Sequence, residues 1–164
     1  MKKSAAPVLT NRHHSLQFSR GYSLPSKQNL IQDGGFETGD TWTGFVWPSR
    51  ITTFMAIFAP HSGAQMAQLS RDTPTTINYT GPLKTVAGAS YKLSFWLLSA
   101  SRISDSNFKM LWNGNVVFEA PQRRSYGYTL MEVTVKATGN DNLSILTQNS
   151  LSFYLLDDVS LVRA

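Results

Sequence analysis

The 164-residue chain contains no cysteine, which excludes disulfide bonds, thiolate zinc sites and thiol nucleophiles. Its longest strongly apolar run, residues 54–59, is much shorter than the ~18–20 residues of a membrane-spanning helix. The first residues are basic but lack the apolar stretch of ~7–15 residues that a secretory signal requires. These absences predict a soluble protein without an export signal and without a membrane partner.

Charged residues are also scarce, at 15% of the chain against a usual ~25%, whereas 41% of the residues are hydrophobic and 12% aromatic. Such a composition favours β-strands with polar outer faces over helices, because Thr and aromatic residues fit a pleated surface well. The net charge of +5 has one source. Residues 1–28 contain five basic side chains and no acid, and residues 29–164 contain ten of each sign.

Residues 1–28 show neither helical nor alternating hydrophobic periodicity and contain two prolines. We therefore expect a basic, extended anchoring arm, separate from a domain that spans residues 29–164. The arm has scattered apolar side chains that could anchor it on a partner protein, of which the candidates are Leu9, Leu16, Phe18 and Tyr22. A solvated tail is the alternative.

From residue 29 onward the chain consists of short β-like runs separated by turn residues. Tyr91, Leu93 and Phe95 fall on one face of a run whose other face is polar, as in a half-buried strand. Asn113-Gly114 separates two further runs and predicts a two-residue hairpin turn. Other β-like runs lie at residues 29–33, 51–59, 66–70, 76–85, 128–137, 143–148 and 151–162. About nine or ten strands at this spacing indicate an all-β sandwich.

Several segments, in this order, resemble the β-jelly-roll carbohydrate-binding modules of the galactose-binding-like superfamily. They are Asn29-Leu-Ile-Gln-Asp-Gly-Gly-Phe-Glu-Thr-Gly-Asp40, His61-Ser-Gly63 before Met66-Ala-Gln-Leu69, Tyr91-Lys-Leu-Ser-Phe-Trp96, Trp112-Asn-Gly114 and Tyr154-Leu-Leu-Asp-Asp-Val-Ser-Leu161. The resemblance covers about residues 29–162 and implies an antiparallel two-sheet jelly roll. The chain departs from the pattern at Thr43-Gly44-Phe45, where family members often have a Gly-Trp pair. Such a fold serves many functions.

The resemblance also implies a structural calcium ion, held by an early Glu, a late Asp and backbone carbonyls. The matching positions are Glu37 and the pair Asp157 and Asp158, and carboxylate oxygens are suitable calcium ligands. Because adjacent strand residues point to opposite faces, we expect at most one of the two aspartates to face inward. The alternative is that Glu37 caps a turn and both aspartates are solvated.

Exposed aromatic rings are the groups with which a neutral sandwich would stack on sugars. The candidates for carbohydrate binding are Trp47, Trp96, Tyr126 and Tyr128. Each of them could instead pack in the core, since one aromatic side chain buries ~150–250 Å². No catalytic residue is assigned, because the three histidines lie in the arm or in a turn and no carboxylate pair is marked.

These observations favour a non-enzymatic structural or binding protein. The first interpretation is a bacteriophage virion component, a decoration or tail-associated protein such as a tail fiber, assembled in the host cytoplasm. Its arm would attach to other virion or scaffold proteins and its sandwich would face cell-surface glycans. The alternative is a stand-alone, extracellular carbohydrate-binding module. Nucleic acid is a poor partner, because the arm has only five charges and no base-reading fold accompanies them.

Overall fold

The computed structural model describes residues 28–55, 57–69, 72–100, 107–121, 124–125, 127–148 and 152–164. These residues form ten strands: β1 Trp42–Thr43, β2 Arg50–Thr52, β3 Met66–Leu69, β4 Thr75–Tyr79, β5 Ser90–Ser99, β6 Asn107–Trp112, β7 Asn115–Glu119, β8 Thr129–Lys136, β9 Leu143–Gln148 and β10 Tyr154–Arg163. The described part of the chain has no helix that could cross a membrane.

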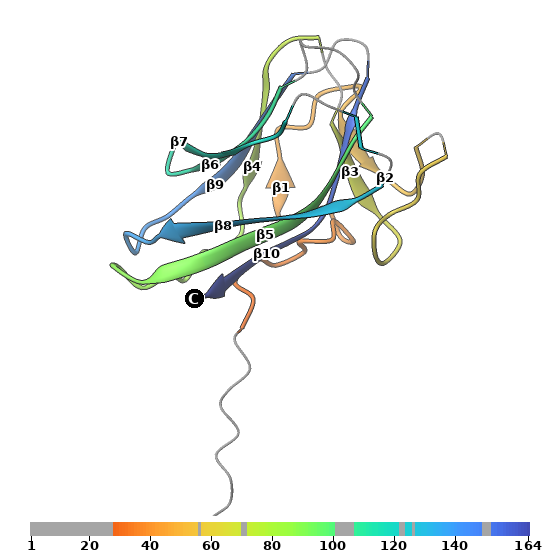
Figure 1. Ribbon diagram of the computed structural model, residues 1–164. Helices are drawn as coiled ribbons and strands as arrows, with labels where there is room; N and C mark the ends of the chain where they lie inside the picture. The colour runs from red at the N-terminus through yellow and green to blue at the C-terminus, as the bar shows by residue number, and fades with distance from the viewer. Residues whose placement is uncertain are drawn as a thin grey trace, which may run out of the picture.

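The strands form two five-stranded antiparallel sheets that pack face to face (Figure 1). The first sheet has the order β1-β4-β9-β6-β7 and the second sheet has the order β2-β3-β10-β5-β8. The predicted antiparallel two-sheet sandwich is therefore confirmed. The predicted arm, with Leu9, Leu16, Phe18 and Tyr22, lies outside the described residues apart from Gln28.

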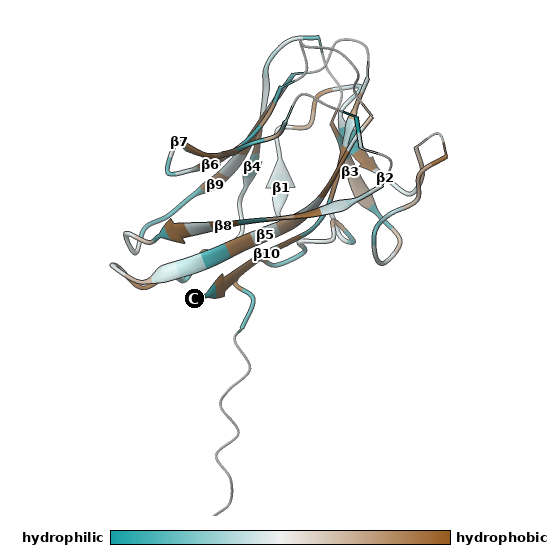
Figure 2. Cartoon of the chain, in the orientation of Figure 1, coloured by the Kyte–Doolittle hydropathy of each residue, from teal (hydrophilic) through white to brown (hydrophobic). Residues whose placement is uncertain are grey.

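The core lies between the sheets and is built by alternation along the strands. Figure 2 shows hydrophobic and hydrophilic residues alternating along β5, the neighbour of β10 in the second sheet. Tyr91, Leu93 and Phe95 are all buried on its inner face, as predicted. Phe95 packs against Phe108 of the first sheet with ring centroids 5.9 Å apart. The two sheets are thus joined mainly by apolar contacts.

The Asn113-Gly114 turn closes the β6–β7 hairpin with φ angles of 53° and 76°, which confirms the predicted hairpin. The Asn113 amide donates to the Asp141 carboxylate at 2.6 Å, and the Thr85 hydroxyl donates to the same carboxylate at 2.6 Å. Burial alone would raise the pKa of Asp141, but these bonds and those from Thr138 hold it well below its usual value. One carboxylate therefore ties three loops together at this end.

Three β-like runs differ from expectation, and in one of them, residues 76–85, only the first four residues belong to a strand, β4. Residues 29–33 are not a strand: the Asn29 side-chain oxygen accepts the N–H groups of Ile31 and Leu161, at 3.0 and 2.9 Å. Of residues 51–59, only the first two continue a strand, β2. The residues that follow cover the outer face of the second sheet, where Met55 and Phe58 pack on a small buried cluster. The apolar character of Met55 and Phe58 reflects their packing on this second cluster rather than a strand.

Candidate functional site

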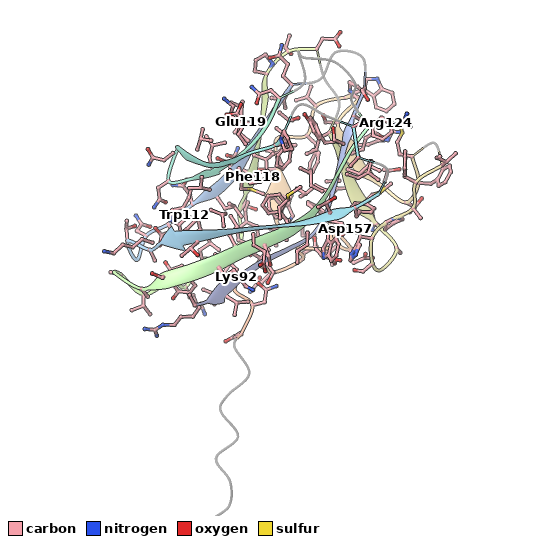
Figure 3. All side chains as sticks on the ribbon, viewed as in Figure 1. Lys92, Trp112, Phe118, Glu119, Arg124 and Asp157 are labelled. Atoms are coloured by element: carbon pink, nitrogen blue, oxygen red, sulfur yellow. The ribbon has the colours of Figure 1, made fainter. Side chains whose placement is uncertain are left out.

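Asp157 is buried on the outer face of the second sheet, opposite Trp96 in the β10–β5 pairing (Figure 3). Its Oδ2 accepts the N–H groups of His61 at 2.8 Å and Ser62 at 3.1 Å, and its Oδ1 accepts the N–H of Asp158 at 2.8 Å. Burial raises the pKa of Asp157 to about 6, although the backbone N–H donors oppose that rise. This carboxylate holds the loop between β2 and β3 against the sheet.

Asp158 leaves the regular strand geometry and is half-exposed. Its φ is 49°, within a register shift between Asp157 and Ser160. Its carboxylate bonds to the His61 Nδ1 at 2.6 Å and accepts the Ser62 hydroxyl at 2.6 Å. Because the Ser62 hydroxyl donates to the carboxylate and not to the imidazole, the three groups do not form a serine nucleophile with its base.

Glu37 holds the same loop from the other side. Its Oε1 accepts the N–H groups of Ala64 at 2.9 Å and Gln65 at 3.1 Å. Gly63 directly precedes Ala64 and has a φ of 59°. A Cβ at this position would collide with the Glu37 carboxylate. The His-Ser-Gly sequence is therefore required locally, because it brings backbone donors to two carboxylates.

The arrangement fits a calcium ion in part. A Cβ on Gly35 would lie 3.7 Å from Asp157 Oδ1 and 3.8 Å from Glu37 Cγ, so this glycine leaves space beside both acids. Asp158 is already bonded by His61 and Ser62. Among the described residues no three His, Asp or Glu side chains are placed to hold a metal ion. Glu37 and Asp157 accept backbone N–H groups, so an ion would have to share their oxygens with these donors, and carbonyl oxygens or water would have to complete the coordination.

Two of the four predicted sugar-binding aromatics are engaged within the protein. Trp96 carries the His61 ring on its face, with centroids 3.9 Å apart. Tyr128 is half-buried and its hydroxyl contacts the Met66 sulfur at 3.0 Å. Burial raises the pKa of Tyr128 above its ordinary value, and the nearby Asp157 adds to the rise. Tyr126 lies outside the described residues.

Trp47 differs from these rings because 73% of its surface is exposed. It lies in a turn closed by a hydrogen bond from the Ser49 N–H to the Val46 carbonyl, at 2.9 Å. The indole borders an open hollow of about 330 Å³, within the ~300–1,000 Å³ range of small-ligand sites. The hollow, which we call the Trp47 hollow, is lined by Trp47, Pro48, Asp72 and Thr73.

The Trp47 hollow combines a flat apolar surface with polar groups. The Arg50 guanidinium lies over the indole at 4.7 Å from its centroid, so a ligand ring would stack on the opposite face. The Gln148 side-chain amide donates to the Asp72 carbonyl at 3.0 Å and anchors this segment to β9. Sequence reasoning missed Arg50, Asp72 and Thr73, because only the folded chain brings them to Trp47.

The outer face of the first sheet offers no comparable aromatic surface. Outward positions on β4 are Thr76 and Asn78, and those on β6 are Asn107, Lys109 and Leu111. None of the described outward residues of this sheet is aromatic. Among the predicted aromatic candidates, only Trp47 is both described and largely exposed.

No protein-family model and no curated protein matches the sequence. Solved structures do match the fold. The module TmCBM61, solved in complex with β-1,4-galactotriose, aligns with a TM-score of 0.61 and 17% identity over 84% of this chain and 99% of that chain. The structure named Family 16 Carbohydrate Binding Module-2 aligns with a TM-score of 0.60 and 19% identity, over 82% of this chain and 99% of that chain.

This chain has the fold of carbohydrate-binding modules. The same fold also matches part of the enzymatically active domain of tailspike protein 4 of bacteriophage CBA120, with a TM-score of 0.56 and 15% identity. That alignment covers 83% of this chain and 21% of the tailspike chain. At these identities the similarity to carbohydrate-binding modules establishes architecture, and the chemistry has to be argued from the site itself.

Proposed function

We propose that this chain binds a neutral carbohydrate, without catalysis, at the Trp47 hollow. The observation that carries the proposal is the 73% exposure of Trp47 beside Asp72 and Thr73. An indole presents a flat apolar face on which the C–H groups of a sugar ring can stack. The Asp72 carboxylate and the Thr73 hydroxyl can take hydrogen bonds from sugar hydroxyls. Arg50 and Asp72 carry opposite charges beside the hollow, so together they add no net charge that would favour a charged sugar.

The carbohydrate-binding-module fold supports this proposal by analogy only. The physical support is the exposed ring. A tryptophan that packed in the core would remove ~150–250 Å² from water, and Trp47 does so only to a small extent. Exposed apolar residues adjoin it in the sequence and in the following loop, namely Val46, Phe54 and Ile57.

The test is affinity electrophoresis of the full chain through gels containing soluble neutral polysaccharides, including galactan and xylan. We expect retardation by at least one of them. Trp47→Ala should weaken binding about tenfold or more, because the stacking of the sugar depends on the indole ring. Trp47→Phe should retain part of the affinity, because it keeps an aromatic ring. Val116→Ala, which removes an exposed apolar side chain of β7 outside the lining of the hollow, is the matched control. Equal retardation of Trp47→Ala and the unaltered chain would contradict the proposal.

We further propose that Glu37 and Asp157 hold a structural calcium ion. When bound, the ion would neutralise the buried Asp157 carboxylate and the exposed Glu37 carboxylate. The support is the space beside Gly35 and the absence of a basic side chain bonded to Asp157 among the described residues. Glu37 and Asp157 would hold the β2–β3 loop through their hydrogen bonds to its backbone N–H groups, with or without the ion.

A bacteriophage virion component remains the second proposed function. Its support is the charge distribution, since all of the net charge of +5 arises from residues 1–28. The similarity to a tailspike domain shows a shared fold and nothing about assembly. A deletion experiment that tests the anchoring role is given in the Discussion.

A further inference from the structure

The turn between β6 and β7 contains the only Asn-Gly pair in the sequence, Asn113-Gly114. An asparagine in such a pair can lose its side-chain amide without an enzyme, because the nitrogen of the next residue can attack the side-chain carbonyl carbon. Glycine hinders this attack least, since it has no Cβ. Gly114 is exposed, and a Cβ at its position would meet no atom within 4 Å. The turn therefore has the sequence and the open surroundings that favour this reaction.

The side-chain amide of Asn113 is held from both sides in the folded protein. Its Nδ2 donates to the Asp141 Oδ1 at 2.6 Å, and its Oδ1 accepts the Asn142 N–H at 2.8 Å. The Asn113 N–H also donates to the Asn142 carbonyl at 3.0 Å. Because these bonds restrict rotation of the side chain, they restrict the approach of its carbonyl carbon to the Gly114 nitrogen. The fold thus protects the amide for as long as the bonds last.

Asp141 accepts every one of its bonds, so it depends on a donor at position 113. Besides the Asn113 amide, the Thr85 hydroxyl donates to it at 2.6 Å and the Thr138 hydroxyl at 2.8 Å. We call Thr85, Asn113, Thr138 and Asp141 the Asp141 hub. An ionised aspartate in place of Asn113 has no hydrogen to donate, and it would put a second negative charge next to Asp141. Two carboxylates this close cannot both stay ionised without a large cost, so the hub could not form in its present arrangement.

We propose that Asn113 is a deamidation site and that its conversion to aspartate opens the Asp141 hub. In the first step the Gly114 nitrogen bonds to the Asn113 Cγ and gives up its proton, while the bond from Cγ to Nδ2 breaks and ammonia leaves. Water then opens the cyclic imide at either of its two carbonyls, which yields aspartate or isoaspartate. The bonds of the hub slow the first step, and the new carboxylate prevents the hub from re-forming.

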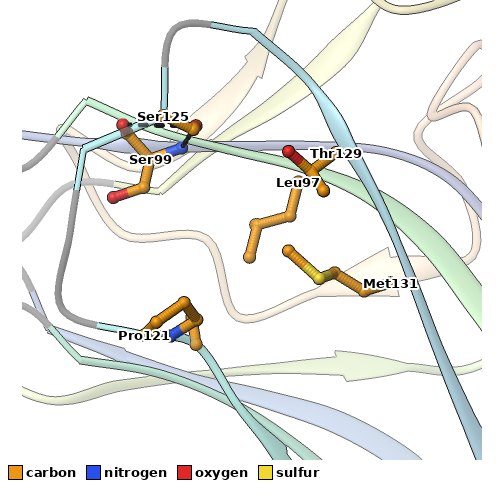
Figure 4. Close-up of a pocket in the computed structure, with 7 residues that line it drawn as sticks. Leu97, Ser99, Pro121, Ser125, Thr129 and Met131 are labelled. Atoms are coloured by element: carbon orange, nitrogen blue, oxygen red, sulfur yellow. Dashed lines mark hydrogen bonds between the residues drawn. The ribbon is translucent and has the colours of Figure 1, made fainter.

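The effect of deamidation should be confined to one end of the second sheet. At the hub end, the Ala137 N–H donates to the Ala89 carbonyl at 2.9 Å, directly before Thr138. At the far end of β5, the Ser99 N–H donates to the Ser125 Oγ at 2.8 Å, and the Ser99 carbonyl accepts the Ser125 N–H at 2.8 Å (Figure 4). Neither serine has an amide side chain, so the reaction leaves this second set of bonds intact.

The first test follows deamidation of the full chain in mildly alkaline buffer by peptide mapping with mass spectrometry. We expect Asn113 to react about tenfold or more faster in urea than in native buffer, because the hub must open first. Asn115 in the same hairpin, which precedes Val116, is the internal control and should react far more slowly. Asp141→Ala should speed the reaction of Asn113 in native buffer, and Thr85→Val, which removes one bond of the hub, serves if that variant does not fold. Equal rates in urea and native buffer, or an unchanged rate in the folded variant, would overturn the proposal.

The second test introduces the product directly. Asn113→Asp should shift the urea-unfolding equilibrium about tenfold or more toward the unfolded state, because a hydrogen bond to a charged group becomes a like-charge contact. Asn115→Asp adds the same charge to the same hairpin on an exposed side chain and is the matched control, with little expected change.

Hydrogen exchange then locates the effect. The N–H groups of Ala137 and Asn142 should exchange faster in Asn113→Asp, whereas the Ser125 N–H should keep its rate. Combining Asn113→Asp with Asp141→Asn returns a donor to the pair and should recover part of the stability. Equal stability of Asn113→Asp and Asn115→Asp would show that the Asn113 amide does not hold the hub, and the proposal would fail.

Discussion

The imidazole of His61 lies flat on the indole of Trp96, with ring centroids 3.9 Å apart and ring planes 17° from parallel. The His61 Nδ1 is bonded to Asp158 at 2.6 Å, so the ring is fixed by a stacking contact and by a polar contact at once. Tyr128 packs on the same imidazole edge-on at 5.5 Å. Trp96 therefore supports the β2–β3 loop, and one face of its indole is covered by His61.

Replacing His61 with Ala should lower the free energy of unfolding by about 1–3 kcal/mol, because an aromatic contact and a hydrogen bond to a charged group are lost together. His61→Phe should recover part of that loss, since it keeps the stacked ring without the bond to Asp158. Urea unfolding followed by tryptophan fluorescence measures both variants. If His61→Ala is as stable as the unaltered chain, the β2–β3 loop is held without help from the His61 side chain, by the backbone bonds to Asp157.

The architecture of the sandwich could be predicted from local sequence because its signals are local. Tyr91, Leu93 and Phe95 alternate with polar residues, and this periodicity alone assigns one face of β5 to the core. Asn113-Gly114 likewise carries its own turn geometry. By contrast, Met55 and Phe58 are apolar for a reason that lies elsewhere in the chain, since they pack on a cluster on the outer face of the second sheet.

The candidate sites could be predicted only in part, because they depend on distant segments meeting. Trp47 was a candidate by residue type, but Asp72 reaches it only through the β4–β9 end of the first sheet. The cover over Trp96 depends on His61, whose N–H is held by Asp157, the residue that the strand register places opposite Trp96.

In calcium-free buffer, the carboxyl carbon of Asp157 should titrate with a midpoint near pH 6 in a ¹³C NMR experiment. The pKa in the folded chain is raised above the unfolded value of ~3.9, so the folded state binds this proton more tightly. The stability that this proton contributes is complete below about pH 4 and is lost as the pH rises through about 6. A midpoint at or below 4 would mean that the backbone donors outweigh burial.

Calcium should raise the melting temperature of the protein at pH 7 and a chelator should reverse the change. A ligand at ~100 times its Kd contributes about 2.7 kcal/mol, which is roughly 5–10 °C for a domain of this size. Glu37→Gln should remove the response, whereas Asp40→Asn, an exposed acid nearby, should keep it. Identical melts with calcium and with chelator would eliminate the calcium proposal.

Removing residues 1–28 should leave the sandwich folded with an unchanged melting temperature, and should abolish association with virion particles. Ordering a backbone costs ~1–2 kcal/mol per residue, and the scattered apolar side chains of the arm cannot offset this cost without a partner. The cut lies before Asn29, whose side chain bonds Leu161, and before Ile31, which is 4% exposed. Co-sedimentation with particles and thermal unfolding are the two measurements.

Removing residues 1–33 is the matched control for that deletion, because it takes away the Asn29 bonds, the buried Ile31 side chain and the Asp33 carboxylate that caps Thr38 and Gly39. This longer deletion should destabilise the domain, so loss of association there says nothing about anchoring.

The salt dependence of binding distinguishes the two kinds of partner. If the arm binds a protein through its apolar side chains, the affinity should depend little on salt, whereas for nucleic acid the logarithm of the affinity should fall with the logarithm of the salt concentration with a slope of up to about −0.9 per neutralised phosphate. Normal co-sedimentation of the 1–28 deletion would remove the anchoring role, and with it the support that the charge distribution gives to a virion component.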